Sequence, residues 1–267
     1  MPLYDSIGKN YATSRVPDPR IVKAIIDLLD LPKSSTIADI GAGTGGYSLA
    51  LANQGYSVYA IEPSSMMRSQ AIEHPQVKWF PGYAEALPLP DKSVDAAVSI
   101  LTIHHFSNLK KAFQEMYRIV INGAIVLLTF DIRLAQKIWL YDYFPCLWED
   151  ALRFLPLAEI ANLIQTNTHR YVETFPLMLP SDLSDLFAAA GWNRPEMYLN
   201  PDIRAGISSF VLADESLVAQ GVKSLAADLN NHQWDAKYGK IRKLTEIDVG
   251  YRFLRATIDK NLANKGE

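Results

Sequence analysis

The feature that most constrains this chain is a glycine-rich turn that directly follows a short apolar segment. Residues 36–40 (TIADI) are typical of a buried strand, and residues 41–46 (GAGTGG) lead into a helix expected from about 47 to 53. Glycines let the chain turn sharply and let backbone atoms approach a ligand, because no Cβ intervenes. The amino end of the following helix is electropositive and suits a carboxylate or a phosphate. The segment therefore predicts a strand–turn–helix unit that binds a ligand.

Further strands and helices alternate along the first half of the chain. Strands that are almost continuously apolar and alternate with helices are typical of a parallel sheet covered on both faces. The predicted fold class is therefore α/β, with a doubly wound and mostly parallel sheet. The expected strands are 57–61, 77–80, 94–100 and 124–130, and the expected helices are 19–31, 64–72 and 108–120.

The alternation stops after Asp131, and this break suggests how the chain is organised. We expect a core formed by residues 1–131 and completed by residues 157–179 and 245–267. Two helical insertions, 132–156 and 180–244, would form a cap over the edge of the sheet where the ligand binds. No linker is long enough to separate independent domains.

Composition and charge narrow the expected class of protein. The formal net charge of −3 gives no general attraction to nucleic acid or to anionic membranes, so neither partner is expected. Cys146 is the only cysteine, which excludes an internal disulfide and a multi-cysteine metal site. The chain has no secretory signal pattern and no apolar run long enough to span a bilayer. A soluble, cytoplasmic protein without a metal is predicted.

Two kinds of cofactor fit the glycine-rich turn when it is considered alone. Gly41, Gly43 and Gly46 satisfy the dinucleotide pattern G-x-G-x-x-G, and Glu62 lies 21 residues after Gly41 at the end of the next strand. A carboxylate in that position can accept two hydrogen bonds from a ribose diol. Three features disfavour a dinucleotide: Asp39 before the first glycine, a helix preceding the strand, and the segment 82–95.

In combination these segments resemble the class I S-adenosylmethionine-dependent methyltransferases, especially the ubiquinone/menaquinone methyltransferase-like branch. The resemblance covers roughly residues 35–131. It implies a Rossmann-like, seven-stranded sheet whose last strand is antiparallel, and residues 247–258 are the candidate for that strand. The motifs that carry it are 39–45 (DIGAGTG), 59–64 (YAIEPS), 82–95 (GYAEALPLPDKSVD) and 103–106 (IHHF).

The resemblance also implies which residues contact S-adenosyl-L-methionine. The turn would line the methionine end, Glu62 would hold the ribose, the segment after Gly82 would border the adenine, and the end of the fourth strand would pass beneath the sulfonium. Tyr83 stands where many relatives carry Asp, so a backbone or stacking contact would replace an acidic one. The implied residues are Asp39, Gly41, Ala42, Gly43, Glu62, Pro63, Ala84, Glu85, Ile100 and Leu101.

Four further residues have both a functional and a structural interpretation. Relatives often fold the N-terminal segment over the cofactor, so Tyr11 and Arg15 would contact it. Arg15 could form a bidentate ion pair with the methionine carboxylate. Alternatively, Arg15 is a surface residue near the chain terminus. His104 and His105 follow the fourth strand, and either could act as a general base or be a structural histidine.

The aromatic residues of the first insertion are candidates for the acceptor pocket. Trp139, Tyr143 and Trp148 could line an apolar pocket, or they could belong to the core. The predicted function is methyl transfer from S-adenosylmethionine to a small, partly apolar acceptor. Two alternatives are an NAD(P)-dependent oxidoreductase that uses the same glycines and a regulator that binds the cofactor without turnover.

Overall fold

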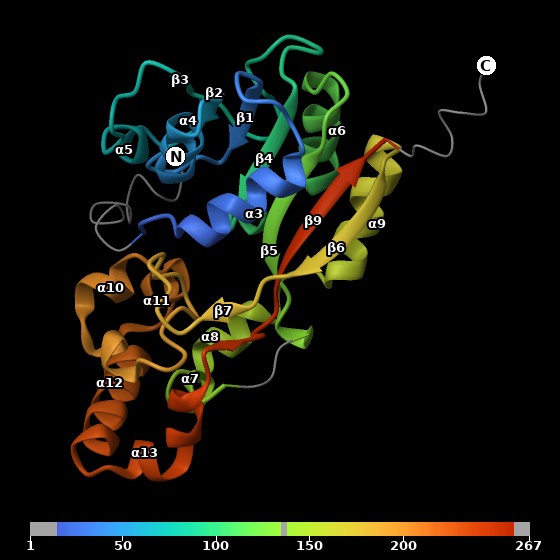
Figure 1. Cartoon of the computed structure of the whole chain (residues 1–267). Helices are drawn as coiled ribbons and strands as arrows, with labels where there is room; N and C mark the ends of the chain where they lie inside the picture. The colour runs from blue at the N-terminus through green and yellow to red at the C-terminus, as the bar shows by residue number, and fades with distance from the viewer. Residues whose placement is uncertain (1–14, 135–137, 259–267) are drawn as a thin grey trace.

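The centre of the computed structural model, which describes residues 15–134 and 138–258, is a seven-stranded sheet (Figure 1). Its strands are β1 (Thr36–Ile40), β2 (Ser57–Ile61), β3 (Val77–Phe80), β4 (Ala96–Ile100), β5 (Ile125–Phe130), β6 (Tyr171–Pro176) and β9 (Tyr251–Thr257). Their order is β3-β2-β1-β4-β5-β9-β6. The first five are parallel, and β9 is antiparallel to both of its neighbours. The predicted mostly parallel sheet with an antiparallel last strand is confirmed.

The strand order reverses at β1, and this reversal positions the ligand site. β1 pairs with β2 on one side and with β4 on the other, so the chain leaves their carboxyl ends in opposite directions. A crevice opens at such a point in open α/β sheets. All five residues of β4 are buried, as expected for a central strand covered on both faces.

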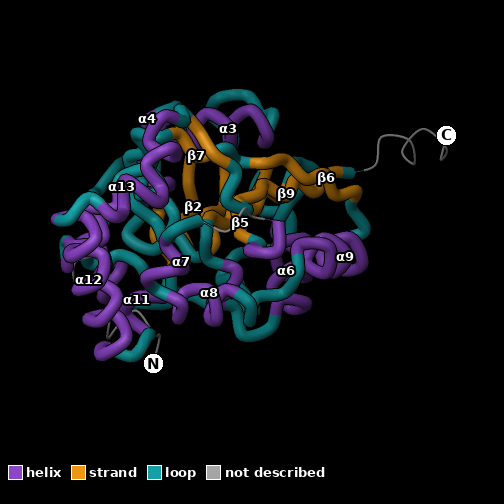
Figure 2. The backbone as a smooth tube through the Cα atoms, turned by 90° about the horizontal axis from the view of Figure 1, so that it is seen from below, coloured by secondary structure: helices purple, strands orange, loops and turns teal. Residues whose placement is uncertain are grey.

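Helices cover both faces of the sheet (Figure 2). α3 (Pro19–Leu29) and α4 (Gly46–Asn53) lie on one face, and α6 (Leu109–Ile119) and α9 (Leu157–Thr168) lie on the other. α3 begins where the Asp18 carboxylate accepts a hydrogen bond from the Arg20 amide, as expected of a capping residue before Pro19. α5 (Ser65–Arg68) is shorter than the helix expected over residues 64–72.

The two insertions lie together beyond the carboxyl ends of β4 and β5 (Figure 1). Residues 181–194 form turns at the start of the second insertion, which the sequence predicts to be mostly helical, and Gly191 and Pro195 disfavour a continuous helix there. β7 and β8 pair antiparallel where the second insertion leaves and rejoins the core. The elements of this region are η2 (Ile132–Leu134), α7 (Leu140–Tyr143), α8 (Pro145–Ala151), β7 (Leu179–Pro180), η3 (Pro195–Leu199), α10 (Pro201–Ala205), α11 (Ser208–Leu212), α12 (Glu215–Asn230), α13 (Gln233–Tyr238), η4 (Gly239–Lys243) and β8 (Glu246–Ile247).

The cap and one face of the sheet share a continuous apolar core. Trp139, Trp192 and Trp234 of the cap belong to the same buried cluster as Ile21 of α3 and Val126 of β5. A second cluster lies on the opposite face, beneath α6 and α9. The cap is therefore packed onto the core through side chains and is more than a loop that crosses the surface.

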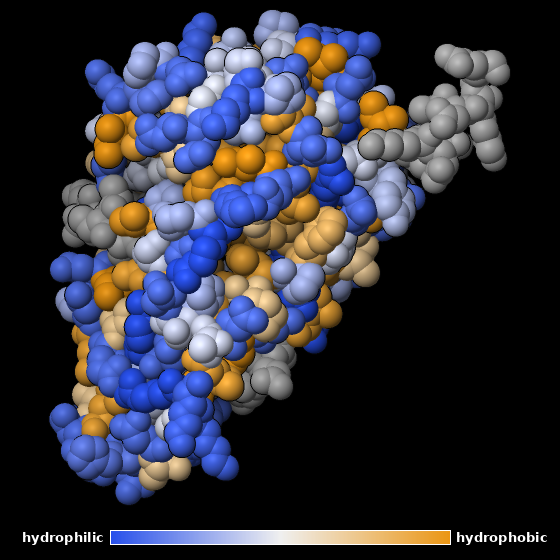
Figure 3. Space-filling view, viewed as in Figure 1, coloured by the Kyte–Doolittle hydropathy of each residue, from blue (hydrophilic) through white to orange (hydrophobic). Residues whose placement is uncertain are grey.

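The surface seen in Figure 3 is mixed. Hydrophilic residues cover much of the lower part, where α12 and α13 lie, and apolar residues are scattered among them. Among the described residues, no helix is both long and apolar enough to cross a membrane.

Candidate functional site

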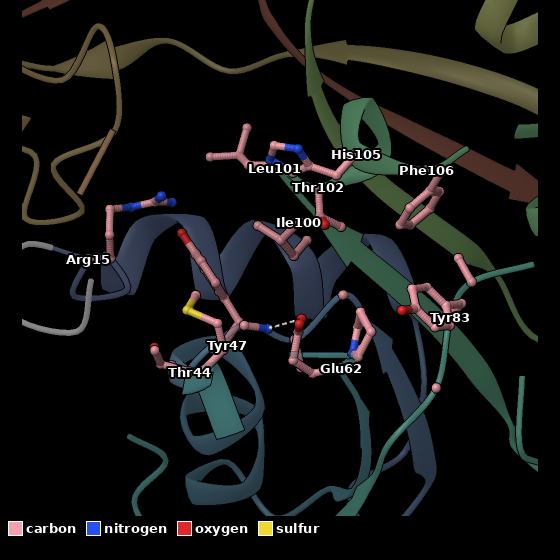
Figure 4. Close-up of a pocket in the computed structure, with 18 of the residues that line it drawn as sticks. Arg15, Thr44, Tyr47, Glu62, Tyr83, Ile100, Leu101, Thr102, His105 and Phe106 are labelled. Atoms are coloured by element: carbon pink, nitrogen blue, oxygen red, sulfur yellow. Dashed lines mark hydrogen bonds between the residues drawn. The ribbon is translucent and has the colours of Figure 1, made fainter. Parts of the chain in front are cut away.

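A cavity of about 270 Å³ opens at the carboxyl ends of β1, β2 and β4. The glycine-rich turn and Glu62 form its floor in Figure 4, Ile100 and Leu101 lie across from them, and Tyr83 and Arg15 stand at opposite sides. The resemblance placed its cofactor contacts on these same segments. The cavity occupies the crevice that the reversed strand order creates.

Two glycines of the turn are required for different reasons. Gly41 and Gly43 have φ values of +75° and +59°, which disfavour side chains. A Cβ on Gly41 would lie 2.5 Å from Oγ1 of Thr102, so the protein itself excludes it. A Cβ on Gly43 would meet only Cε of Met67, at 3.4 Å. The space beside Gly43 is therefore left open toward the cavity, which makes it a cradle that a side chain would fill.

Glu62 is fixed by backbone amides and still lines the cavity. Its Oε2 accepts a hydrogen bond from the Gly43 amide at 3.0 Å (Figure 4), and its Oε1 accepts one from the Ser64 amide at 2.8 Å. Each carboxylate oxygen can accept a further bond. Pro63 follows it in the cavity wall, as does Ala42 of the turn. The arrangement can receive a diol.

Asp39 lies behind the turn and is absent from the cavity wall. It is buried, and its Oδ2 accepts a hydrogen bond from Oγ of Ser48 at 2.6 Å. Burial raises the pKa of the Asp39 carboxyl to about 6; the Ser48 bond opposes this shift, and the Glu62 charge adds to it. The residue therefore ties β1 to α4 beneath the turn.

The segment after Gly82 forms another wall. Tyr83, Ala84 and Glu85 line the cavity, and Tyr83 is 55% exposed. The Glu85 carboxylate accepts hydrogen bonds from the amide and hydroxyl of Ser107 and from the Asn108 amide, at 2.6, 2.9 and 3.0 Å. Glu85 thus joins this segment to the start of α6, while the Tyr83 ring remains available for stacking.

Leu101 separates this cavity from a second one. It directly follows β4 and has φ +53°, which is unusual for a residue with a branched side chain. Its amide donates to the Leu128 carbonyl at 2.8 Å, so the neighbouring strand holds the turn in place. Such backbone conformations often occur at functional sites, where the surrounding structure maintains them.

Arg15 also borders both cavities. Its Nε lies 2.6 Å from Oδ1 of Asp185, and the Tyr47 hydroxyl donates to Oδ2 of Asp185 at 2.8 Å. Asp185 belongs to the second insertion and Tyr47 to α4, so this cluster joins the core to the cap. The motifs gave no signal for Asp185. Tyr11 lies outside the described residues.

The second cavity measures about 100 Å³ and lies between the end of β5 and the cap. Several aromatic and aliphatic side chains form its walls, and a few polar groups face into it. Among the residues that line it are Leu101, His104, Thr129, Tyr141, Leu147, Asp150, Phe154, Phe187, Ser208 and Tyr251. In residues 15–134 and 138–258, no group of three or more His, Cys, Asp or Glu side chains could hold a metal ion.

The two histidines face different cavities. His105 lines the first and His104 the second, with their ring centroids 4.0 Å apart. His104 is solvent-accessible because it faces the second cavity, yet protein surrounds it. Burial lowers the pKa of His104 to about 3 and that of His105 to about 4. Both imidazoles are therefore neutral at neutral pH and are weak bases.

The three aromatic residues proposed for the acceptor pocket line neither cavity. Trp139 is buried, and its indole donates to the Trp192 carbonyl at 2.5 Å. The Tyr143 hydroxyl donates to Asp228 at 2.6 Å, and the Trp148 ring packs edge-on against Tyr141 at 5.1 Å. Their neighbours Tyr141 and Leu147 supply the wall instead.

Comparisons with known proteins identify similar chains. A family model described as a methyltransferase domain matches residues 38–128. A solved structure from Anabaena variabilis, provisionally described as a methyltransferase from an antibiotic biosynthesis pathway, is 69% identical. The match covers 92% of this chain and 99% of that one, with a TM-score of 0.91.

More distant relatives match smaller parts of the chain. A demethylmenaquinone methyltransferase of Paenarthrobacter aurescens is 26% identical over 196 residues, which cover 72% of this chain and 74% of the relative. An uncharacterized methyltransferase of a Geobacillus strain is 35% identical over 89 residues. That match covers 33% of this chain, which spans only 42% of the relative's length.

Proposed function

Because the chain belongs to the class I S-adenosylmethionine-dependent methyltransferases of the quinone-methyltransferase-like kind, we propose that it methylates a small molecule held in the second cavity. The observation that carries this proposal is the position of Leu101 and Arg15, which border both cavities. One cavity adjoins the other at the end of β4, where the reacting groups must meet. The comparisons give no support to a nicotinamide-dependent oxidoreductase.

The polar groups and the open space of the first cavity support binding of S-adenosylmethionine there. Glu62 would accept hydrogen bonds from the ribose hydroxyls, and the open side of Gly43 would admit the ligand close to the backbone. Tyr83 and Ala84 would border the adenine, and Arg15 would attract the carboxylate. The cofactor, when bound, supplies a methyl group on a positively charged sulfur.

The insertions would contribute the acceptor site and exclude water. Their side chains surround the second cavity, and a dry enclosure strengthens electrostatic interactions within it. Holding the acceptor in line with the methyl group would supply much of the rate acceleration. His104 and His105 are uncharged, so they would not repel a sulfonium, and either could accept a hydrogen bond from an acceptor.

Calorimetric titration with S-adenosylhomocysteine tests the cofactor site. Glu62→Gln keeps the side-chain size but places an amide group opposite a backbone donor and weakens acceptance from the ribose. We expect a loss of roughly 1–3 kcal/mol of binding free energy. Glu159→Gln is the matched control, because it changes an exposed carboxylate on α9 that does not line the cavity. Unchanged affinity in Glu62→Gln would remove Glu62 from the site.

Ligand specificity and turnover separate the remaining alternatives. S-adenosylhomocysteine should raise the melting temperature of the wild-type protein, and NADH should not. Conversion of S-adenosylmethionine to S-adenosylhomocysteine, stimulated by a small-molecule acceptor from a chemically diverse panel, would distinguish an enzyme from a regulator. A larger shift with NADH would favour the oxidoreductase interpretation.

A further inference from the structure

Two residues that line the second cavity, Tyr141 and Asp150, carry polar groups that form no hydrogen bond or ion pair within residues 15–134 and 138–258. Tyr141 is only 7% exposed. Buried polar groups are normally paired, so these two are available to a ligand.

The walls of this cavity limit the size and polarity of its occupant. Its volume of about 100 Å³ is comparable with the roughly 150 Å³ of a protein cavity known to bind benzene. Phe154, Phe187 and Tyr251 contribute aromatic surface to it. An apolar group about the size of one aromatic ring fits this space without any movement of the cap.

The free carboxylate indicates the charge of the occupant. Burial raises the pKa of Asp150, and the charge of Arg153 opposes this shift. A ligand with a positive charge or an N–H donor would supply the missing partner. Aromatic faces also attract cations. An anionic ligand, by contrast, would be repelled by Asp150.

Methyl transfer to nitrogen produces such a charge. An amine that binds as an ammonium first gives one proton to the Asp150 carboxylate or to water, and its lone pair then forms the new N–C bond as the S–C bond of the sulfonium breaks, leaving a neutral thioether and a positively charged nitrogen. That nitrogen then releases a proton to water. Transfer to an alcohol requires removal of a much less acidic proton. His104 and His105 are weak bases, so they are poorly suited to remove a hydroxyl proton.

We propose that the acceptor is a small amine with an apolar body about one ring in size, held at its nitrogen by Asp150 and Tyr141. This inference rests on the proposed methyltransferase function and specifies its substrate class. Asp150 lies on α8 and Tyr141 on α7, so the first insertion provides the selectivity. Phe154 and Phe187 provide surface for the apolar body.

Calorimetry on the full chain saturated with S-adenosylhomocysteine tests the proposal with three probes of similar shape: benzylamine, benzyl alcohol and benzoate. We expect benzylamine to bind at least tenfold more tightly than the other two. Asp150→Asn should abolish this preference and leave S-adenosylhomocysteine affinity within twofold. Glu149→Gln is the matched control, because it removes an exposed carboxylate from the same helix and should change neither affinity.

The stability of Asp150→Asn provides an independent measurement. A partly buried carboxylate without a partner does not stabilise the fold, so the variant should melt at the same temperature as the wild type or higher. Benzylamine binding no more tightly than benzyl alcohol would overturn the proposal, as would an undiminished preference in Asp150→Asn. Failure of the methyltransferase function would differ: wild-type protein would not bind S-adenosylhomocysteine before any probe is added.

Discussion

The two adjoining cavities are built in different ways. Most of the polar groups in the first one are already fixed by the protein: Glu62 by amides of the turn and Glu85 by the start of α6. In the second, the Tyr141 hydroxyl and the Asp150 carboxylate form no hydrogen bond or ion pair within residues 15–134 and 138–258, and most of the wall is aromatic or aliphatic. The ends of three strands that are neighbours in the sheet, β2, β1 and β4, help to form the first cavity, whereas residues from distant segments of the chain form the second.

This contrast indicates how recognition is divided between them. A ligand common to a whole family can be bound by a preorganised site, because its hydrogen-bonding groups are constant. An acceptor differs between enzymes, and the groups that we propose select it lie outside residues 38–128, which the methyltransferase domain model matches. Variants in the two regions should therefore fail differently. Three predictions test this difference.

The largest expected effect is on stability, in Trp139→Ala. This side chain is buried, donates to the Trp192 carbonyl and packs edge-on against Trp234 at 5.3 Å. Its removal should cost about 3–5 kcal/mol of unfolding free energy, measured by urea denaturation. Tyr141→Phe is the control, because it removes only a hydroxyl that faces the cavity and should cost less than about 1.5 kcal/mol. If the Trp139→Ala protein is as stable as the wild type but binds the acceptor less tightly, Trp139 contacts the acceptor and is not a core residue.

The next effect is on cofactor binding, in Gly43→Ala. The positive φ should cost about 1–2 kcal/mol of stability, but the nearest protein atom leaves room for the methyl group. Affinity for S-adenosylhomocysteine, measured by calorimetry, should fall at least a hundredfold, or about 2.7 kcal/mol, because the methyl group enters the cradle.

Gly41→Ala separates the two roles of the turn. It forces a methyl group against Thr102, so its main loss should be in the free energy of unfolding. Nearly unchanged affinity in Gly43→Ala would mean that the ligand does not approach this part of the turn.

The smallest effect concerns the pH dependence of stability, through Asp39→Asn in the ligand-free protein. An aspartate in the unfolded chain titrates near 3.9, whereas Asp39 titrates at about 6 when folded. Between these pH values the folded state holds a proton that the unfolded state lacks, so ionisation lowers stability as pH rises. The variant avoids this loss, and its advantage should grow to on the order of 2 kcal/mol by pH 7.

Urea denaturation of both proteins at pH 4, 5, 6 and 7 measures this effect. Asp27→Asn, which removes an exposed carboxylate from α3, is the control. Parallel pH curves for wild type and Asp39→Asn would contradict a raised pKa for Asp39.

The sequence was sufficient to predict the sheet and the cofactor wall, because local patterns determine both. A few neighbouring residues are enough to predict each of these features: the apolar strands β1, β2, β4 and β5, and the turn from Gly41 to Gly46. The antiparallel β9 was predicted through the family resemblance. The second insertion was predicted to be mostly helical, whereas residues 181–194 form turns that depend on Gly191 and Pro195 together with contacts to the core.

The second cavity could not be predicted in the same way. Trp139 and Tyr141 lie two residues apart, and only the direction of α7 relative to β5 decides which of them faces the cavity. Asp185 reaches the cofactor cavity because Arg15 and Tyr47 hold it there, and no local pattern signals such a contact across the chain. Tertiary packing determines both outcomes.

The apolar core shared by the cap and the sheet has a consequence for how the protein unfolds. Trp234 and Phe144 of the cap are buried in the same cluster as Ile25 and Leu128 of the core, so separating the cap would expose both surfaces to water. The chain should therefore unfold in a single cooperative transition, without an intermediate in which the cap alone has melted. It follows that the cap cannot be exchanged as a module between enzymes. Changes of specificity have to be made one cavity-facing side chain at a time.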